Sequence, residues 1–269
     1  MTTLRTAALG ALLCADPDRK AELARGIDID NLPAGAERPF DEPGGIPGRP
    51  DRPLLVAHTE LKQRSMATAE GRASLLHALA HIELNAIDLA LDLCARFDAM
   101  PDAFYREWAG VAQEEALHFQ LLRDHLATLG HGYGDFPAHG ALWQMAEKTK
   151  TDLLARLALV PRTLEARGLD ASPPIKAKLV GAGDLRAGEI LDIILRDEIG
   201  HVAIGNRWYR MVCEQRGLDP LSTYAELAAR YQAPRQRGPF NLEARRAAGF
   251  DEAELEALMA GPSTSLPSP

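Results

Sequence analysis

The chain has 269 residues, of which 46% are hydrophobic and 25% are charged, a balance typical of a globular protein rather than of a disordered one. Its formal net charge of −8 argues against a generally basic surface of the kind that binds nucleic acids. Three cysteines form an odd and sparse set, which does not favour a disulfide framework or a cysteine zinc site and fits a reducing compartment.

The first 53 residues predict a helix followed by an arm. Residues 4–25 have a helical pattern, and charged residues follow the short apolar run from Ala7 to Ala15 at once, so we favour a short amphipathic helix over a signal peptide. Residues 26–53 hold six prolines and predict a segment without regular structure, either a linker or an arm wrapped over the core. No apolar stretch approaches the about 18 residues of a membrane-spanning helix, and we expect a cytoplasmic protein.

Apolar residues then recur every three or four positions, which predicts helices. We place the four main helices at residues 69–98, 101–129, 149–168 and 184–215. The short connection before Pro101 predicts that the first two helices are antiparallel neighbours, and the longer one from Gly130 to Lys148 would be a crossover between two helical hairpins.

The remaining segments complete an all-α fold without a β-strand series. We expect a single domain with a four-helix bundle at residues 54–216, a C-terminal helical extension at 217–260 that contains two or three short helices, and a disordered tail at 261–269.

Glu83 stands in an otherwise apolar helical stripe. The residues that share its face at helical spacing are Leu76, Leu79, Ala80, Ala86, Ile87, Ala90, Leu93, Cys94 and Phe97. The spacing therefore predicts a carboxylate that points into a core, where an uncompensated charge costs several kcal/mol.

Two Glu-x-x-His motifs repeat this pattern on other predicted helices. Glu115 and His118 form the first, and Glu198 and His201 form the second, each among apolar neighbours. Residues three apart on a helix share one face, so a carboxylate and an imidazole so placed can bind one metal ion together. A bundle that binds two metal ions uses two such pairs and one further Glu from each of the other two helices.

Glu165 is our choice for the fourth carboxylate because of its spacing. Glu83 precedes Glu115 by 32 residues and Glu165 precedes Glu198 by 33, as expected of a duplicated helical hairpin. The stripe around Glu165 is less clean, since Pro161 and Arg162 share it and Pro161 should kink the helix. The alternative for Glu165 is a surface ion pair with Arg162, and for each Glu-x-x-His motif it is a solvated or merely satisfied polar pair.

Several stretches resemble the ferritin-like superfamily of di-iron and di-manganese carboxylate proteins. The match is closest to an uncharacterised bacterial family that is similar to the tRNA hydroxylase acting on isopentenylated adenosine. The stretches are residues 81–90 (HIELNAIDLA), 114–119 (EEALHF), 159–170 (LVPRTLEARGLD) and 196–201 (RDEIGH).

The resemblance implies a ferritin-like bundle with a dinuclear non-haem centre, in which Glu115 and Glu198 bridge the two metal ions. The implied ligands are Glu83, Glu115, His118, Glu165, Glu198 and His201. Asp197 matches the acid that orients a ligand imidazole, and Glu114 is its equivalent in the first half. Gly200 departs from the pattern, because oxygen-activating members often carry Arg at this position.

We therefore expect an oxidoreductase that activates dioxygen or peroxide, with hydroxylation of a small or nucleoside-type substrate as the leading hypothesis. Carboxylate and imidazole ligands suit iron or manganese, and of these two metals we expect iron. An electron donor would be a partner, tRNA is a partner by resemblance only, and a monomer or homodimer is expected. The alternatives are a metal-storage protein and a catalase-like di-manganese enzyme.

Other polar residues carry weaker predictions. Two groups of basic residues are interpreted as solvated helix faces rather than as a tRNA-binding surface: Arg230, Arg235, Arg237, Arg245 and Arg246, and Arg162, Arg167, Lys176 and Lys178. Tyr105 and Tyr209 are expected in the core. Surface positions or positions behind the ligands are expected for most of His77, His81, His125, His131 and His139.

Overall fold

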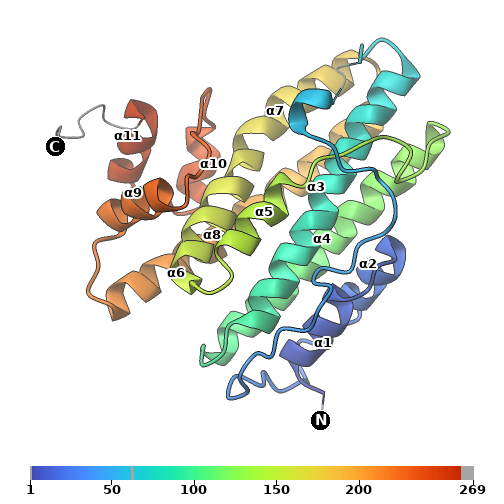
Figure 1. Cartoon of the computed structure of the whole chain (residues 1–269). Helices are drawn as coiled ribbons and strands as arrows, with labels where there is room; N and C mark the ends of the chain where they lie inside the picture. Colours follow the sequence, from blue (N-terminus) through green and yellow to red (C-terminus); the bar gives the residue numbers. More distant parts are fainter. Residues whose placement is uncertain (1, 62–63, 262–269) are drawn as a thin grey trace. The chain divides into compact units, whose positions relative to one another are not determined.

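The computed structural model describes residues 2–61 and 64–261, and all regular elements within these ranges are helical (Figure 1). One isolated bridge joins Leu55 and Ala138. The prediction of an all-α fold is confirmed, whereas the predicted tail lies outside the described residues from position 262 onwards. Among the described helices, none combines the length and apolar character needed to cross a bilayer.

The helices follow one another along the chain with short connections, apart from the arm. They are α1 (Leu4–Leu12), α2 (Pro17–Arg25), the 3-10 helix η1 (His58–Glu60), α3 (Ala69–Arg96), α4 (Asp102–Thr128), α5 (Ala141–Lys148), α6 (Leu153–Leu159), the π-helix η2 (Val160–Glu165), α7 (Ala166–Gly181), α8 (Leu185–Gln215), α9 (Pro220–Arg230), α10 (Leu242–Ala247) and α11 (Glu252–Ala260).

The chain divides into two compact units. The first comprises residues 1–144 and 175–194, and the second comprises residues 145–174 and 195–269. The boundaries between these segments fall within α5, α7 and α8.

The first unit is organised around α3 and α4, which pack against each other as predicted, with α1 and α2 packed on both of them. The turn between α3 and α4 contains Ala99 at a φ of 55°. Large side chains such as Leu76, Ile87, Trp108 and Phe119 are fully buried in this unit. Their burial supplies the main stabilising contribution, about 1.5–3 kcal/mol for each large apolar side chain.

The predicted helix over residues 4–25 is two helices rather than one. Asp16 caps α2, where its side chain accepts a hydrogen bond from the backbone N–H of Arg19, and Pro17 occupies the first helical turn. These two residues favour a helix start. The sequence therefore contained a start signal in the middle of the range that we predicted as continuous.

The arm at residues 26–53 contains no helix, as predicted, and is fixed to the helices of the first unit by buried cations. Arg5 of α1 donates to the carbonyl of Gly35, at 3.0 Å. Lys20 of α2 donates to the carbonyl of Gly48, at 2.8 Å. The carbonyl of Gly35 also accepts a hydrogen bond from the backbone N–H of Arg38. Because a segment without regular structure makes few hydrogen bonds of its own, side-chain donors help to satisfy its buried backbone carbonyls.

The predicted third helix, residues 149–168, differs most from expectation. In its place α6, η2 and α7 follow one another, and α7 continues to Gly181 although Pro173 and Pro174 lie inside it. Pro173 cannot donate to the carbonyl of Leu169, and Asn241 donates its side-chain N–H to that carbonyl instead, at 3.2 Å. The predicted crossover from Gly130 to Lys148 also contains a helix, α5.

The second unit has a small apolar core of its own, between α7, α8, α10 and α11. Its buried members are Ala166, Leu169, Val202, Ala244, Ala248, Phe250 and Leu255. Helices α9, α10 and α11 confirm the prediction of two or three short helices in the C-terminal extension.

Candidate metal centre

Helix α3 brings Glu83 into the interior of the first unit. Thr68 caps the helix by accepting a hydrogen bond from the backbone N–H of Gly71, at 3.0 Å. The apolar stripe predicted around Glu83 is buried in the structure except for Phe97 at its end, and Glu83 itself is only 5% exposed. The carboxylate is therefore held inside the unit by the packing of the stripe that surrounds it.

Helix α4 places Glu115 and His118 on its buried face, and both side chains are fully buried. The Nδ1 atom of His118 lies 3.3 Å from an oxygen of Glu115 and 3.3 Å from an oxygen of Glu83. One imidazole nitrogen thus contacts two carboxylates from two helices. The structure brings these three residues together, and their role as metal ligands stays a prediction.

The electrostatic consequence is visible in the pKa of His118. Burial alone would lower this pKa, but hydrogen bonds and charge interactions with Glu115 and Glu83 outweigh burial and raise it to about 11. A site that stabilises a proton so strongly has a negative potential, which also attracts metal cations.

This buried Glu/His cluster could hold a metal ion. Each of Glu83, Glu115 and His118 offers a ligand atom, and these atoms lie within 4.8 Å of one another. The donors are oxygen and imidazole nitrogen, which suit iron or manganese. Thiolate ligation is not favoured, because burial raises the pKa of Cys94, on the same helix as Glu83, to about 12.

The second Glu-x-x-His motif lies on α8 in the second unit. Glu198 is 7% exposed and His201 is 1% exposed, and the Nδ1 atom of His201 lies 3.9 Å from an oxygen of Glu198. Glu198 is also among the buried residues that could bind a metal ion. Gly200, the position before His201, is exposed.

Glu165, the remaining predicted ligand, is the last residue of the π-helix η2 and is half-buried. Its oxygen Oε2 is shielded from solvent. The alternative of an ion pair with Arg162 is not what the structure shows, since the guanidinium of Arg162 pairs with Glu254. That Glu165 binds a metal stays a prediction.

Glu114 and Asp197 are the two acids that we expected to orient the ligand imidazoles, and both lie closer to the surface than the ligands. Glu114 is exposed on α4, one position before Glu115. Asp197 is half-buried and accepts a hydrogen bond from Arg196, at 2.7 Å. Their orienting roles also stay predictions.

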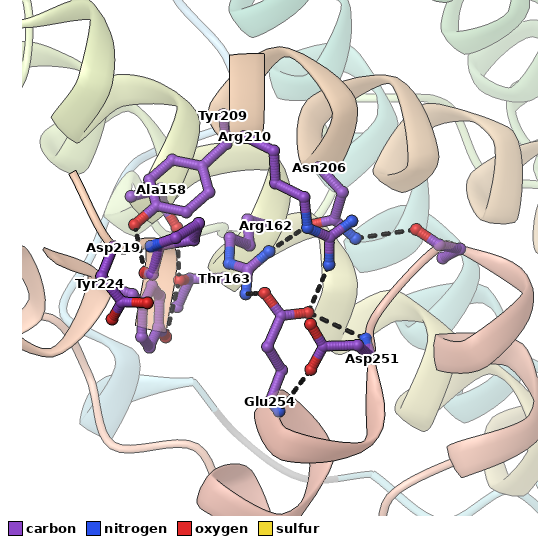
Figure 2. Close-up of polar contacts among 12 residues, drawn as sticks. Ala158, Arg162, Thr163, Asn206, Tyr209, Arg210, Asp219, Tyr224, Asp251 and Glu254 are labelled. Carbon is purple, nitrogen blue, oxygen red and sulfur yellow. Dashed lines mark hydrogen bonds and ion pairs between the residues drawn. The ribbon is translucent and has the colours of Figure 1, made fainter. Parts of the chain in front are cut away.

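The interpretation of the basic residues as solvated was wrong for Arg162 and Arg245, which are 3% and 0% exposed. Arg162 donates to Glu254 and Asn206, and Arg245 donates to Asp170. Figure 2 shows the group around Arg162 and Glu254. One feature of the sequence indicated that Arg162 is buried, namely the helix face that it shares with apolar residues. Its partner could not be predicted, because Glu254 lies 92 positions away.

Most of the remaining aromatic and histidine residues are part of the packing. Tyr105 and Tyr209 are fully buried, as predicted. His77, one of the five histidines of which most were expected at the surface or behind the ligands, is also fully buried. His77 accepts a hydrogen bond from the backbone N–H of Gly134 and stacks on Tyr133. This contact fixes the loop after α4 to α3 within the first unit.

Comparison with known proteins places the chain in a family without an assigned activity. Residues 13–256 match the family described as "Protein of unknown function (DUF455)". An uncharacterised protein of Haemophilus influenzae is 46% identical over 260 residues, which cover 91% of this chain and 90% of that protein. No solved structure matches the chain significantly.

Proposed function

The chain belongs to this DUF455 family, and from that premise we propose that it is a dinuclear non-haem metal oxidoreductase that activates dioxygen or peroxide. Hydroxylation of a small or nucleoside-type substrate is the reaction that we favour, on a ferritin-like four-helix bundle. The observation that carries the proposal is the contact of one buried imidazole, His118, with the two buried carboxylates of Glu83 and Glu115.

Charge balance supports a metal at this cluster. With both carboxylates ionised, a protonated His118 leaves the three groups with one net negative charge. The neutral imidazole that a metal ligand requires leaves two negative charges. A divalent cation neutralises the second arrangement, and buried charges need such compensation.

The proposal of a second metal ion is based on the repeat in the sequence. Glu165, Glu198 and His201 correspond to Glu83, Glu115 and His118 at an offset of 82 or 83 residues. We therefore assign one imidazole and one terminal carboxylate to each ion. By resemblance, Glu115 and Glu198 are the bridging carboxylates.

Two redox-active metal ions, when bound, supply electrons for the reduction of dioxygen or peroxide. The protein residues would bind and orient these ions and exclude water from them. The fully buried Glu115 and His118 lie where bulk water cannot compete for a metal. A turnover that inserts oxygen into a substrate also needs an external reductant, so an electron donor is part of the proposal.

Metal analysis of the freshly purified full chain tests the proposal. We expect two iron or manganese ions per chain. Anaerobic loading with ferrous iron followed by oxygen should produce an absorbance change and oxygen uptake in the presence of a one-electron reductant. His118→Ala should lose metal, whereas His131→Ala, a partly exposed histidine outside the cluster, should retain it.

A chain that binds no metal and takes up no oxygen would reject the proposal. Disproportionation of hydrogen peroxide by the manganese-loaded protein would indicate the catalase-like alternative. A cage-sized species that holds many irons per chain would indicate storage.

A further inference from the structure

The π-helix η2 interrupts the helical path in the second unit, immediately before α7. Its backbone is wound more widely than an α-helix: the N–H of Ala166 donates to the carbonyl of Pro161, five residues earlier. Thr163 donates its hydroxyl to the carbonyl of Ala158, at 2.8 Å. Single π turns occur frequently at functional sites, and this one ends at Glu165, a ligand in the proposed function.

A buried arginine lies in the middle of this turn. Arg162 donates from Nη1 to Asn206, at 2.8 Å, and from Nη2 to Glu254. The aromatic rings of Tyr209, Tyr224 and Phe250 surround its guanidinium, with centroids 4.8 to 5.4 Å from the central carbon. The side chain is therefore fixed on several sides (Figure 2).

Glu254, on α11, is fixed as firmly as its partner. It is 6% exposed, and its second oxygen accepts hydrogen bonds from Arg210 of α8 and from the backbone N–H of Asp251. The latter bond belongs to the capping box that starts α11. One carboxylate thus joins the π turn, α8 and the start of α11.

The buried ion pair of Arg162 and Glu254 is better explained as a device that fixes local geometry than as a source of folding stability. A buried ion pair contributes little net stability compared with well-packed apolar residues, yet it specifies one arrangement because neither charge can be left alone. Arg162 lies three residues before Glu165, so fixing its side chain also fixes the turn that presents Glu165.

We propose that Arg162 and Glu254 are positioning residues that hold the π turn in the shape in which Glu165 binds the second metal ion. This inference rests on the proposed function. The C-terminal extension is then part of the metal centre's support, although neither Arg162 nor Glu254 touches the ion.

The test compares Glu254→Gln with the wild type, both as the full chain, by titration with Mn²⁺ and detection by electron paramagnetic resonance. We expect the variant to bind the first ion as the wild type does and the second about tenfold to a hundredfold more weakly, the range seen when groups that orient metal ligands are removed. Glu252→Gln is the matched control, because Glu252 is an acid of the same helix whose exposed ion pair with Arg246 does not involve the π turn.

The melting temperature and circular dichroism of the metal-free proteins show whether the variants are folded. If Glu254→Gln does not fold, Arg210→Gln gives a milder version of the test, because it loosens Glu254 and leaves its bond to Arg162 in place. The expected result is again a selective loss of affinity for the second ion.

The outcomes separate the two proposals. A wild type that binds fewer than two ions overturns the proposed function and the positioning role with it. A wild type that binds two ions, together with a folded variant that binds both with unchanged affinity, overturns only the positioning role.

Discussion

The two Glu-x-x-His motifs have similar sequences but different structural support. In the first unit, the accompanying acid Glu83 lies within α3, an uninterrupted helix of 28 residues. In the second unit, the corresponding acid Glu165 ends a π turn whose Arg162 pairs with Glu254, 92 residues later in the chain. A regular helix positions a ligand by its periodicity alone, whereas an irregular turn needs distant contacts to do so.

The largest expected effect tests whether both halves contribute to one centre. Glu115→Ala and Glu198→Ala should each abolish binding of both metal ions, because each residue is assigned as a bridge between them. Metal content after dialysis, measured by elemental analysis, checks this. Asp124→Ala, which removes an exposed acid of α4, is the control and should keep two ions. Loss of only one ion in either variant would show that the halves bind their metals separately.

The next effect probes the packing around the π turn. A Cβ atom at Gly205 of α8 would lie 2.6 Å from Cβ of Pro161, so Gly205→Ala should lower the free energy of unfolding by about 1–3 kcal/mol. Gly200→Ala meets nothing within 4 Å and should raise it by about 0.5–1 kcal/mol through helix propensity. Urea unfolding measures both changes. Equal effects would contradict the close contact at Gly205.

A third prediction concerns the first unit at low pH. Burial lowers the pKa of His77 to about 4, against about 6.5 for a histidine in an unfolded chain. The unfolded state therefore binds more protons between these values, and stability falls as the pH falls from about 6.5 to 4. His77→Gln should reduce the loss of unfolding free energy between pH 7.5 and pH 5 by about 2 kcal/mol.

Urea unfolding at both pH values provides the measurement for His77. The wild type, unfolded under the same conditions, is the reference. A His77→Gln variant with the full wild-type pH dependence would show that this histidine is accessible to protons in the folded protein.

The smallest effect tests how α7 tolerates its prolines. Asn241→Ala removes the donor to the carbonyl of Leu169 and the cap of α10, and should cost about 1–2 kcal/mol of unfolding free energy. Asn31→Ala removes a side chain that bonds to Asp28, three residues earlier, and should cost less. If the two costs are equal, the distant contact is not what sustains α7.

The sequence was sufficient where local rules decide the structure. The ends of α3, α4 and α8 lie within two residues of the predicted positions, because their apolar stripes are long and regular. The same periodicity identified Glu83, Glu115 and His118 as buried neighbours. The periodicity could not give the extent of α7, because Pro173 predicts a helix end. The donor that compensates for this proline, Asn241, lies 72 residues from Leu169.

The burial of Arg162 and Arg245 was missed for the same reason. Charged residues on a helix are usually solvated, and nothing near Arg162 in the sequence indicates that Glu254 will compensate its charge. Only the folded arrangement shows which arginines are buried.

The attachment of the N-terminal helices has a consequence for biosynthesis. Arg5 donates to the carbonyl of Ala95, 90 residues later, and Lys20 pairs with Asp88. At about 5–20 residues per second, the ribosome needs on the order of 5 to 20 seconds to deliver these partners. During that interval α1, α2 and the arm emerge without the surfaces that bury them. The cationic side chains of α1 and α2 therefore reach their buried partners only after most of α3 has been synthesised.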